Sequence, residues 1–198
     1  MSVEIQKQIK SAFLLFVAMT LLTGIIYPLV VTGLAKLLFP WQANGSLIEH
    51  GGQKLGSALI GQAFSDPKYF WGRPSATSPF PYNATASSGS NSGLTNPEYL
   101  TLVKSRITHL SQNSSPTALI PLDLITASAS GLDPDISPEA ARFQVARIAQ
   151  ERGLPEASLN LMIEKAIKLR AYEILGDPRV NVLQLNLILD NRITGTSK

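Results

Sequence analysis

An uncharged, apolar run from Ser11 to Ala35 constrains this chain more than any other feature of its sequence. At a rise of about 1.5 Å per residue, a helix of this length would extend roughly 37 Å, whereas the hydrocarbon core of a bilayer is about 30 Å thick. The run therefore predicts one transmembrane helix, with bounds at residues 11–39. The remaining residues, 40–198, are enough for a single soluble domain on one side of the membrane.

The charges that flank the run predict its orientation. Lys7 and Lys10 lie on its N-terminal side and outweigh Glu4. The positive-inside rule then places residues 1–10 in the cytoplasm and the soluble domain outside it. A cleaved signal peptide is the competing interpretation, but its apolar region normally has only about 7–15 residues and ends in a small-x-small cleavage site. The length of the run favours an uncleaved anchor.

Within the run, small or kink-forming residues recur at intervals of four, at Thr20, Gly24, Pro28 and Thr32. They fall along one face of the helix, and small side chains on such a face permit close approach of a second transmembrane helix. The pattern predicts an interface within the membrane. The alternative stays open that Gly and Pro are simply commoner in membrane helices than in soluble ones.

Composition argues against several kinds of site and partner. The chain has no cysteine, and its two histidines, His50 and His109, lie in no metal-binding spacing, so no metal site is expected. Lys and Arg number 17 against 14 for Asp and Glu, without a basic run that could follow a nucleic-acid backbone. No nucleic-acid partner is expected.

The motifs of common catalytic sites are also missing from the sequence. It contains no G-x-x-x-x-G-K-[ST] phosphate loop, no D-K-T-G-T phosphorylation sequence and no G-x-S-x-G elbow. ATP hydrolysis by those routes is excluded, and no catalytic residue is expected. A carboxylate pair of the glycosidase type stays open, because the separation of such a pair depends on the fold.

Hydrophobic periodicity predicts a mixed α+β fold for the soluble domain. The segment 180–190 alternates like a strand, yet Asn181 could cap a helix there, and the pattern does not separate the two. Ser137, followed by Pro138, is a strong helix start. Helices are expected at 97–109, 138–152 and from about 155 to 167, and strands at 57–64 and 121–129.

Two arginines have predicted structural roles. Arg147 is expected on the solvent face of the helix at 138–152. Arg73 follows the aromatic residues Phe70 and Trp71 and is expected to lie over their rings, as a small core with a cation–π contact. The alternative stays open that these aromatic residues and Arg73 form a ligand platform through a cation–π contact.

A long polar loop at 75–97 consists mostly of Ser, Thr, Asn, Gly and Pro and has no regular periodicity. A loop of this length inside a compact domain is usually either disordered or functional. Because it offers little to bury against its own domain, we expect its order to come from a partner. The residues expected to dock on that partner are Tyr82, Asn83, Ser90 and Asn91.

Six short strings, taken in order, carry a resemblance to a known family. They are G-Q-A-F at 61–64, Y-F-W-G-R-P-S-A at 69–76, Y-N-A then S-G-S-N at 82–91, T-A-S-A-S-G-L-D-P at 126–134, I-S-P-E-A-A at 136–141 and V-N-V-L-Q-L-N at 180–186. Together they resemble the C subunit of the Kdp potassium-transporting ATPase over nearly the whole chain. Asp135 departs from the family pattern, where His or Asn is expected.

The resemblance implies a non-catalytic subunit of a bacterial inner-membrane complex that imports K⁺ at the expense of ATP. Its implied partners are a channel-like potassium-binding subunit, a P-type subunit that hydrolyses ATP, and a small single-span subunit. The C subunit of this family is described as a catalytic chaperone that raises the affinity of the pump subunit for ATP. The predicted topology conflicts with direct contact between an outside domain and cytoplasmic ATP, so no cofactor is assigned to this chain.

Weak candidates for a phosphate contact lie in the small-residue turn formed by Ser128, Ser130, Gly131 and Asp133, whose backbone N–H groups could face an anion. The competing interpretation is a tight turn that leads to the Ser137 helix start. For the whole chain, the alternative to a transporter subunit is a free-standing, membrane-anchored binding protein or hydrolase of the cell exterior.

Overall fold

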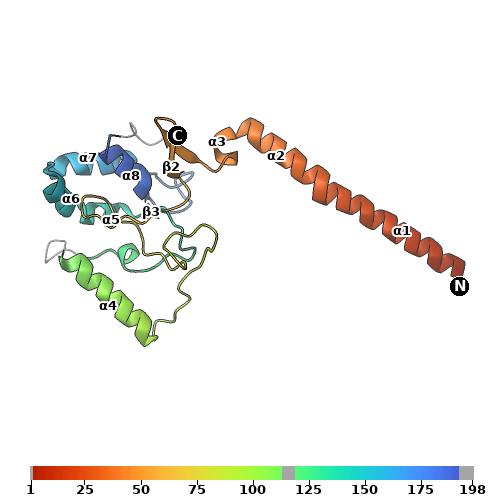
Figure 1. The fold of residues 1–198 in the computed structure, drawn as a ribbon, viewed down its shortest axis with the longest axis horizontal. Coiled ribbons are helices and arrows are strands. Elements are labelled where there is room, and N and C mark those ends of the chain that lie inside the picture. The colour runs from red at the N-terminus through yellow and green to blue at the C-terminus, as the bar shows by residue number, and fades with distance from the viewer. Residues whose placement is uncertain (1, 113–118, 192–198) are drawn as a thin grey trace. The chain divides into compact units, whose positions relative to one another are not determined.

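The computed structural model describes residues 2–112 and 119–191. The chain divides into two units, residues 1–47 and 48–198. The first unit is almost entirely helical, and the second contains the other helices and short strands (Figure 1). This mixture of helix and strand after one N-terminal apolar helix confirms the predicted α+β class.

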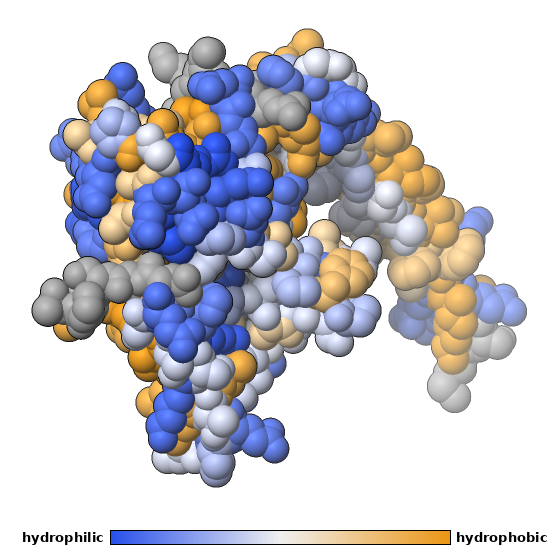
Figure 2. Space-filling model, turned by 60° about the vertical axis from the view of Figure 1, so that its left-hand side comes forward, coloured by the Kyte–Doolittle hydropathy of each residue, from blue (hydrophilic) through white to orange (hydrophobic). Residues whose placement is uncertain are grey.

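The first unit is built on one long apolar helix. Helix α1 (Ser2–Leu21), a π-helical turn (Leu22–Ile26) and helix α2 (Tyr27–Leu38) follow one another without a break. The 36 residues from Val3 to Leu38 are long and apolar enough to cross a membrane. Figure 2 shows hydrophobic side chains along this helix. The helix begins earlier than the predicted bound because the polar residues before the apolar run are helical too.

The π-helical turn lies directly before Pro28. Pro28 has no N–H to donate, and a local widening of the helix is one way to accommodate that loss. The Thr23 hydroxyl donates to the carbonyl oxygen of Met19 at 2.7 Å in the preceding turn. Residues four apart drift slowly around an α-helix, and a wider turn reduces this drift. Thr20, Gly24 and Pro28 therefore lie close to one line along the helix. All three are exposed.

Four short helices form the core of the second unit. Helix α7 contacts α5, α6 and α8, and its Leu159 and Ile163 are fully buried between them. Figure 1 shows α4 apart from this group, and only Leu110 of α4 is buried. The bounds are α4 (Pro97–Gln112), α5 (Pro138–Phe143), α6 (Val145–Arg152), α7 (Glu156–Ala166) and α8 (Val182–Leu189).

The predicted single helix at 138–152 is wrong, because the structure interrupts it at Gln144. The N–H of Gln144 bonds to the carbonyl of Ala141, three residues back, which tightens the turn between α5 and α6. The predicted start is present: the Ser137 hydroxyl accepts from the N–H of Ala140 at 3.0 Å. The end is present too, with Gly153 in the left-handed conformation at φ +64°.

The strands are short and form two separate pairs. Strands β1 (Leu47–His50) and β2 (Gln53–Ser57) make a hairpin that is preceded by helix α3 (Pro40–Ala43). Strands β3 (Asp135–Ile136) and β4 (Val180–Asn181) pair antiparallel, with Asp135 opposite Asn181. The Asn181 side-chain oxygen accepts from the N–H of Gln184 at 3.0 Å and so caps α8. The ambiguous segment 180–190 is thus two residues of strand followed by a helix.

Both predicted strands are wrong. Strand β2 ends at Ser57, where the predicted strand 57–64 would begin, and the chain then turns. Residues 121–129 form a short 3₁₀ helix (Leu122–Leu124) and an irregular segment, with the Thr126 N–H bonded back to Leu122. Leu124 and Ile125 are buried there as side chains of a turn. An apolar run indicates burial, and here the burial comes without a strand.

Asp135 is partly buried at the β3–β4 pair. Its carboxylate accepts from the Asn181 side-chain amide at 3.1 Å and lies 3.0 Å from the Arg179 guanidinium. Burial raises the pKa of Asp135 above its usual value, and these two partners oppose that effect without cancelling it. The folded state therefore holds a proton on Asp135 more tightly than the unfolded state does.

We predict that Asp135→Asn raises the midpoint of thermal unfolding of the full-length chain at pH 7. The charged carboxylate costs stability there, and the amide can still accept from Asn181. As the pH falls through the raised pKa of the folded state, the wild type becomes protonated and its disadvantage shrinks, levelling off below the ordinary Asp pKa of about 4. Parallel melts between pH 3.5 and 7.5 measure this, and a variant less stable than wild type at pH 7 would contradict it.

Candidate functional site

Two buried carboxamides position the aromatic segment at residues 67–73. The Asn186 side chain accepts from the N–H of Phe70 and donates to its carbonyl, both at 2.9 Å. The Gln144 side chain accepts from the N–H of Trp71 at 2.7 Å and donates to its carbonyl at 3.1 Å. Each carboxamide thus pairs with one residue as the backbone of a neighbouring strand would.

Arg147 also binds the aromatic segment. Its guanidinium donates to the carbonyls of Pro67 and Tyr69 and to the Gln144 side-chain oxygen, and it lies 3.7 Å from the centre of the Trp71 ring. Burial lowers the pKa of Arg147 to about 10, so the group stays charged at neutral pH. The prediction that Arg147 faces solvent is wrong, because its side chain is buried.

Arg73 does not lie over the aromatic rings either; Arg147 takes that position. Arg73 forms an ion pair with Asp133 at 3.0 Å, and its backbone carbonyl accepts from the Tyr82 hydroxyl at 2.6 Å. Among the residues that the structure describes, its Nε atom has no hydrogen-bond partner. Arg73 therefore joins the aromatic segment to the start of the polar loop.

The polar loop is ordered by its own domain, contrary to the prediction that a partner must order it. The Ser75 hydroxyl donates to the carbonyl of Gly131 at 2.7 Å, and the Ser88 N–H and the Ser87 hydroxyl both donate to the carbonyl of Ser130. Gly131 has φ +66°, and a Cβ there would lie 2.5 Å from the Ser88 carbonyl oxygen. The loop thus lies across the turn at 128–131.

Two of the four predicted docking residues are used inside the loop. The Asn83 side chain is buried, donates to the carbonyl of Ser78 and accepts from the N–H of Thr85. Burial and the nearby Asp133 carboxylate raise the pKa of Tyr82 to about 12. Asn83 is therefore buried within the loop, whereas Tyr82 is half-buried with its hydroxyl bonded to the Arg73 carbonyl; docking by these two residues stays a prediction.

The other two predicted docking residues are available at the surface. Ser90 and Asn91 are both exposed, and Asn91 holds a left-handed backbone conformation at φ +49°. They belong to the stretch of loop next to Ser88, whose backbone is fixed on the turn at 128–131. Their exposure makes them the docking candidates that the structure retains.

In the turn that holds the weak phosphate candidates, two N–H groups already bond to serine hydroxyls of the same turn. The Ser128 hydroxyl accepts from the N–H of Gly131 at 2.9 Å, and the Ser130 hydroxyl accepts from the N–H of Leu132 at 3.1 Å. The Asp133 carboxylate accepts from the N–H of Asp135 and pairs with Arg73. The structure brings Ser128, Ser130, Gly131 and Asp133 together as a tight turn, which does not fit a phosphate cradle.

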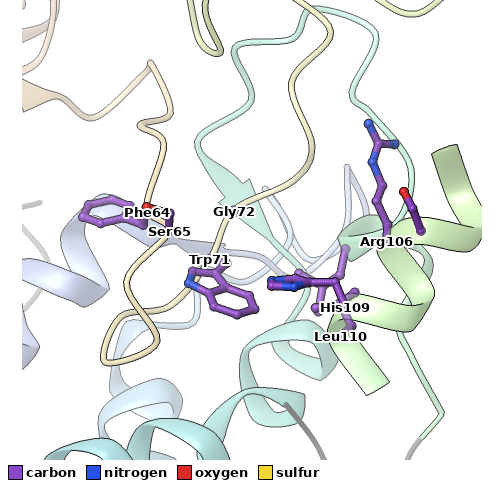
Figure 3. Close-up of a pocket in the computed structure, with 9 residues that line it drawn as sticks. Phe64, Ser65, Trp71, Gly72, Arg106, His109 and Leu110 are labelled. Atoms are coloured by element: carbon purple, nitrogen blue, oxygen red, sulfur yellow. The ribbon is translucent and has the colours of Figure 1, made fainter. Parts of the chain in front are cut away.

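A pocket of about 400 Å³ lies between the aromatic segment and α4. Figure 3 shows the side chains of Trp71 and His109 pointing toward one another, and their rings stack with centroids 5.2 Å apart. Arg106 donates to the carbonyl of Ile125 at 2.8 Å at the same pocket. No sequence pattern indicates this pocket, because its lining comes from segments that are distant in the chain. Its lining is Phe64, Ser65, Trp71, Gly72, Ser105, Arg106, His109, Leu110 and Leu124.

Within residues 2–112 and 119–191, no group of three or more His, Asp or Glu side chains could hold a metal ion. The second hollow of this unit is lined by four aspartates, of which three form ion pairs with arginines. The fourth, Asp123, accepts from the N–H of Ser137. The acidic side chains there have structural partners.

Comparison with known proteins points to one family. The family model described as KdpC, the c chain of the K⁺-transporting ATPase, matches residues 9–191. A protein of Methylococcus capsulatus described as a potassium-transporting ATPase KdpC subunit is 56% identical over 183 residues, which cover 91% of this chain and 96% of that protein. Proteins of the same description from Variovorax paradoxus and Rhodopseudomonas palustris are 56% and 53% identical, over 92% and 93% of this chain and 95% and 98% of their own lengths.

Two buried glutamines provide a matched pair of substitutions. Gln144 is bonded to the backbone of Trp71, whereas neither polar atom of the buried Gln184 side chain has a partner among the described residues. We predict that Gln144→Met lowers the free energy of unfolding by about 2–4 kcal/mol, because it leaves the N–H and carbonyl of Trp71 without this partner and removes the acceptor of one Arg147 bond. Gln184→Met removes two unsatisfied atoms and should raise the free energy of unfolding by about 1 kcal/mol or more.

Chemical unfolding of the full-length chain in detergent measures both changes. The two substitutions are identical in chemistry, so a difference in sign reports only the bonding of the side chain that is replaced. Equal losses in the two variants would show that Gln184 has a polar partner after all.

Proposed function

The chain belongs to the KdpC family of K⁺-transporting ATPase subunits, and we propose that it serves as a non-catalytic subunit that assembles and stabilises the transport complex from outside the cytoplasm. Its partners would be the channel-like potassium-binding subunit, the P-type ATP-hydrolysing subunit and the small single-span subunit that the resemblance implies. The complex would lie in the bacterial inner membrane. Family membership argues against the alternative of a free-standing binding protein or hydrolase.

The observation that carries this proposal is the polar loop with its exposed Ser90 and Asn91. We place this surface against the extracytoplasmic mouth of the channel-like subunit. Hydroxyl and amide groups can hydrogen-bond a polar pore rim without adding a fixed positive charge to the path of K⁺. Arg73 would not contact the ion, since it is paired with Asp133 at the base of the loop.

Within the membrane, we propose that the line of Thr20, Gly24, Pro28 and Thr32 packs against a helix of a larger subunit. These four residues are exposed, and a Cβ added to Gly24 would meet no atom of the described residues within 4 Å. Small residues of this kind allow two helix backbones to approach closely.

We propose that any effect on ATP affinity is indirect and passes through the assembled complex. The predicted orientation separates this domain from cytoplasmic ATP. In addition, two N–H groups in the turn that holds the weak phosphate candidates, those of Gly131 and Leu132, already bond to serine hydroxyls. ATP and K⁺ would then belong to the complex and not to a site on this chain.

Fusions at the C-terminus test the proposed orientation. Alkaline phosphatase fused after Lys198 should be active, because Lys7 and Lys10 hold the N-terminus in the cytoplasm. A fluorescent protein that folds only in the cytoplasm should stay dark at the same position. A glowing fusion together with an inactive phosphatase would reverse the proposed topology.

A charge substitution in the polar loop tests its proposed docking on the channel-like subunit. Ser90→Lys should raise the K⁺ concentration for half-maximal ATPase activity of the purified complex by about two- to fivefold, because a fixed cation would repel K⁺ at the channel mouth. The increase should shrink at high ionic strength. Ser90→Gln is the matched control, since it adds a long side chain without charge. Equal K⁺ responses in the Lys variant, the Gln variant and the wild type would refute docking by this surface.

A further inference from the structure

A hairpin at residues 168–179, between α7 and β4, exposes an unusual number of large apolar side chains. Tyr172 is 86% exposed, Ile174 76%, Leu169 75% and Leu175 59%. These four lie within seven residues of chain. Single exposed apolar residues need no explanation, but a cluster of this kind on a soluble unit marks an interaction surface.

The hairpin is a defined structure and not a loose connection. Lys168 and Arg179 exchange both backbone hydrogen bonds, at 2.8 and 3.0 Å, and Ala171 and Leu175 do the same at 2.9 Å. Arg170 and Asp177 form an ion pair across it at 3.4 Å. The tip at residues 172–174, which the inner bridge Ala171–Leu175 closes, therefore presents its side chains in a fixed arrangement.

The tip itself holds two non-glycine residues in the left-handed conformation, Tyr172 at φ 53° and Glu173 at φ 66°. Such a conformation costs free energy for a residue with a Cβ. It also sets the directions of the two adjacent side chains, and both Tyr172 and Glu173 are exposed.

The single charge at the tip distinguishes between a lipid and a protein as the partner. Insertion of Tyr172 and Ile174 into a bilayer would bring the carboxylate of Glu173, which lies between them, toward the hydrocarbon, and this is costly. A protein pocket can instead meet that carboxylate with a cation at its rim. Aromatic residues fixed at the centre of a contact are also typical of the anchors of protein interfaces.

From these observations we propose that the 168–179 hairpin anchors this chain in an apolar pocket of another subunit of the K⁺-transporting ATPase, with a basic side chain of that subunit paired to Glu173. The inference rests on the proposed role as an assembly subunit. It adds an apolar contact that is separate in sequence from the polar loop.

Photo-crosslinking in the whole complex tests the proposal. The photoreactive amino acid p-benzoylphenylalanine replaces Tyr172 in the full-length chain, and the purified complex is irradiated in lipid nanodiscs. The expected product is a covalent adduct with another subunit of the same complex, identified by mass spectrometry. Adducts with lipid alone, adducts with a second copy of this chain, or no adduct would each overturn the proposal. The same replacement at Leu122, which is 73% exposed elsewhere in the unit, is the control.

Substitutions supply an independent measurement. Tyr172→Ser combined with Ile174→Ser should weaken retention of the other subunits by about tenfold or more in detergent, as loss of interface anchors does. The thermal midpoint of the chain should stay unchanged, because these exposed side chains support no core. Leu122→Ser should leave retention at the wild-type level. Full retention in the double variant would refute the anchor, while the K⁺ response of the Ser90 variants would still test the polar loop separately.

Charge variants test the ion pair at the tip. Glu173→Lys should reduce retention more than Glu173→Gln, because it places like charges together at the pocket rim. Equal retention in the two variants would overturn the proposed basic partner.

Discussion

The second unit depends on hydrogen bonds to the backbone N–H and carbonyl groups of two residues that have no neighbouring strand. These residues, Phe70 and Trp71, are buried and half-buried, and an unpaired buried N–H or carbonyl costs about 1–3 kcal/mol. Gln144 and Asn186 meet this requirement for Trp71 and Phe70. Once the segment is fixed, the rest follows along the chain: Trp71 stacks on His109, Arg73 reaches Asp133, and the polar loop begins from a fixed point.

The features that could be predicted from the sequence are those in which the information is local. The apolar helix, the Ser137 cap, the Gly153 stop and the buried stripe of α7 each depend on residues within a few turns of one another. Arg147 could not be predicted in this way. Its helix position indicates solvent, and only the carbonyls of a segment some 80 residues earlier make its burial favourable.

The polar loop shows the limit of composition as a guide. Its lack of apolar residues correctly indicates that it has no hydrophobic core of its own, but short hydroxyl side chains can satisfy nearby backbone groups, as Ser75 and Ser87 do. The same applies to the docking residues. Tyr82 and Ser90 look equally available in the sequence, but in the structure Tyr82 is half-buried with its hydroxyl bonded to the Arg73 carbonyl, whereas Ser90 is exposed.

The attachment of the loop to that turn also has a kinetic consequence. A segment that folds only on binding loses conformational entropy at that moment, and its association is often limited by the ordering step. Here the Ser88 and Ser130 backbones are joined before any encounter. Approach to a partner would then be a rigid-body collision, whose rate depends on diffusion, orientation and surface charge. The rate at which one copy of this chain replaces another on the partner would depend on the lifetime of the contacts between them. It would not depend on refolding of the loop.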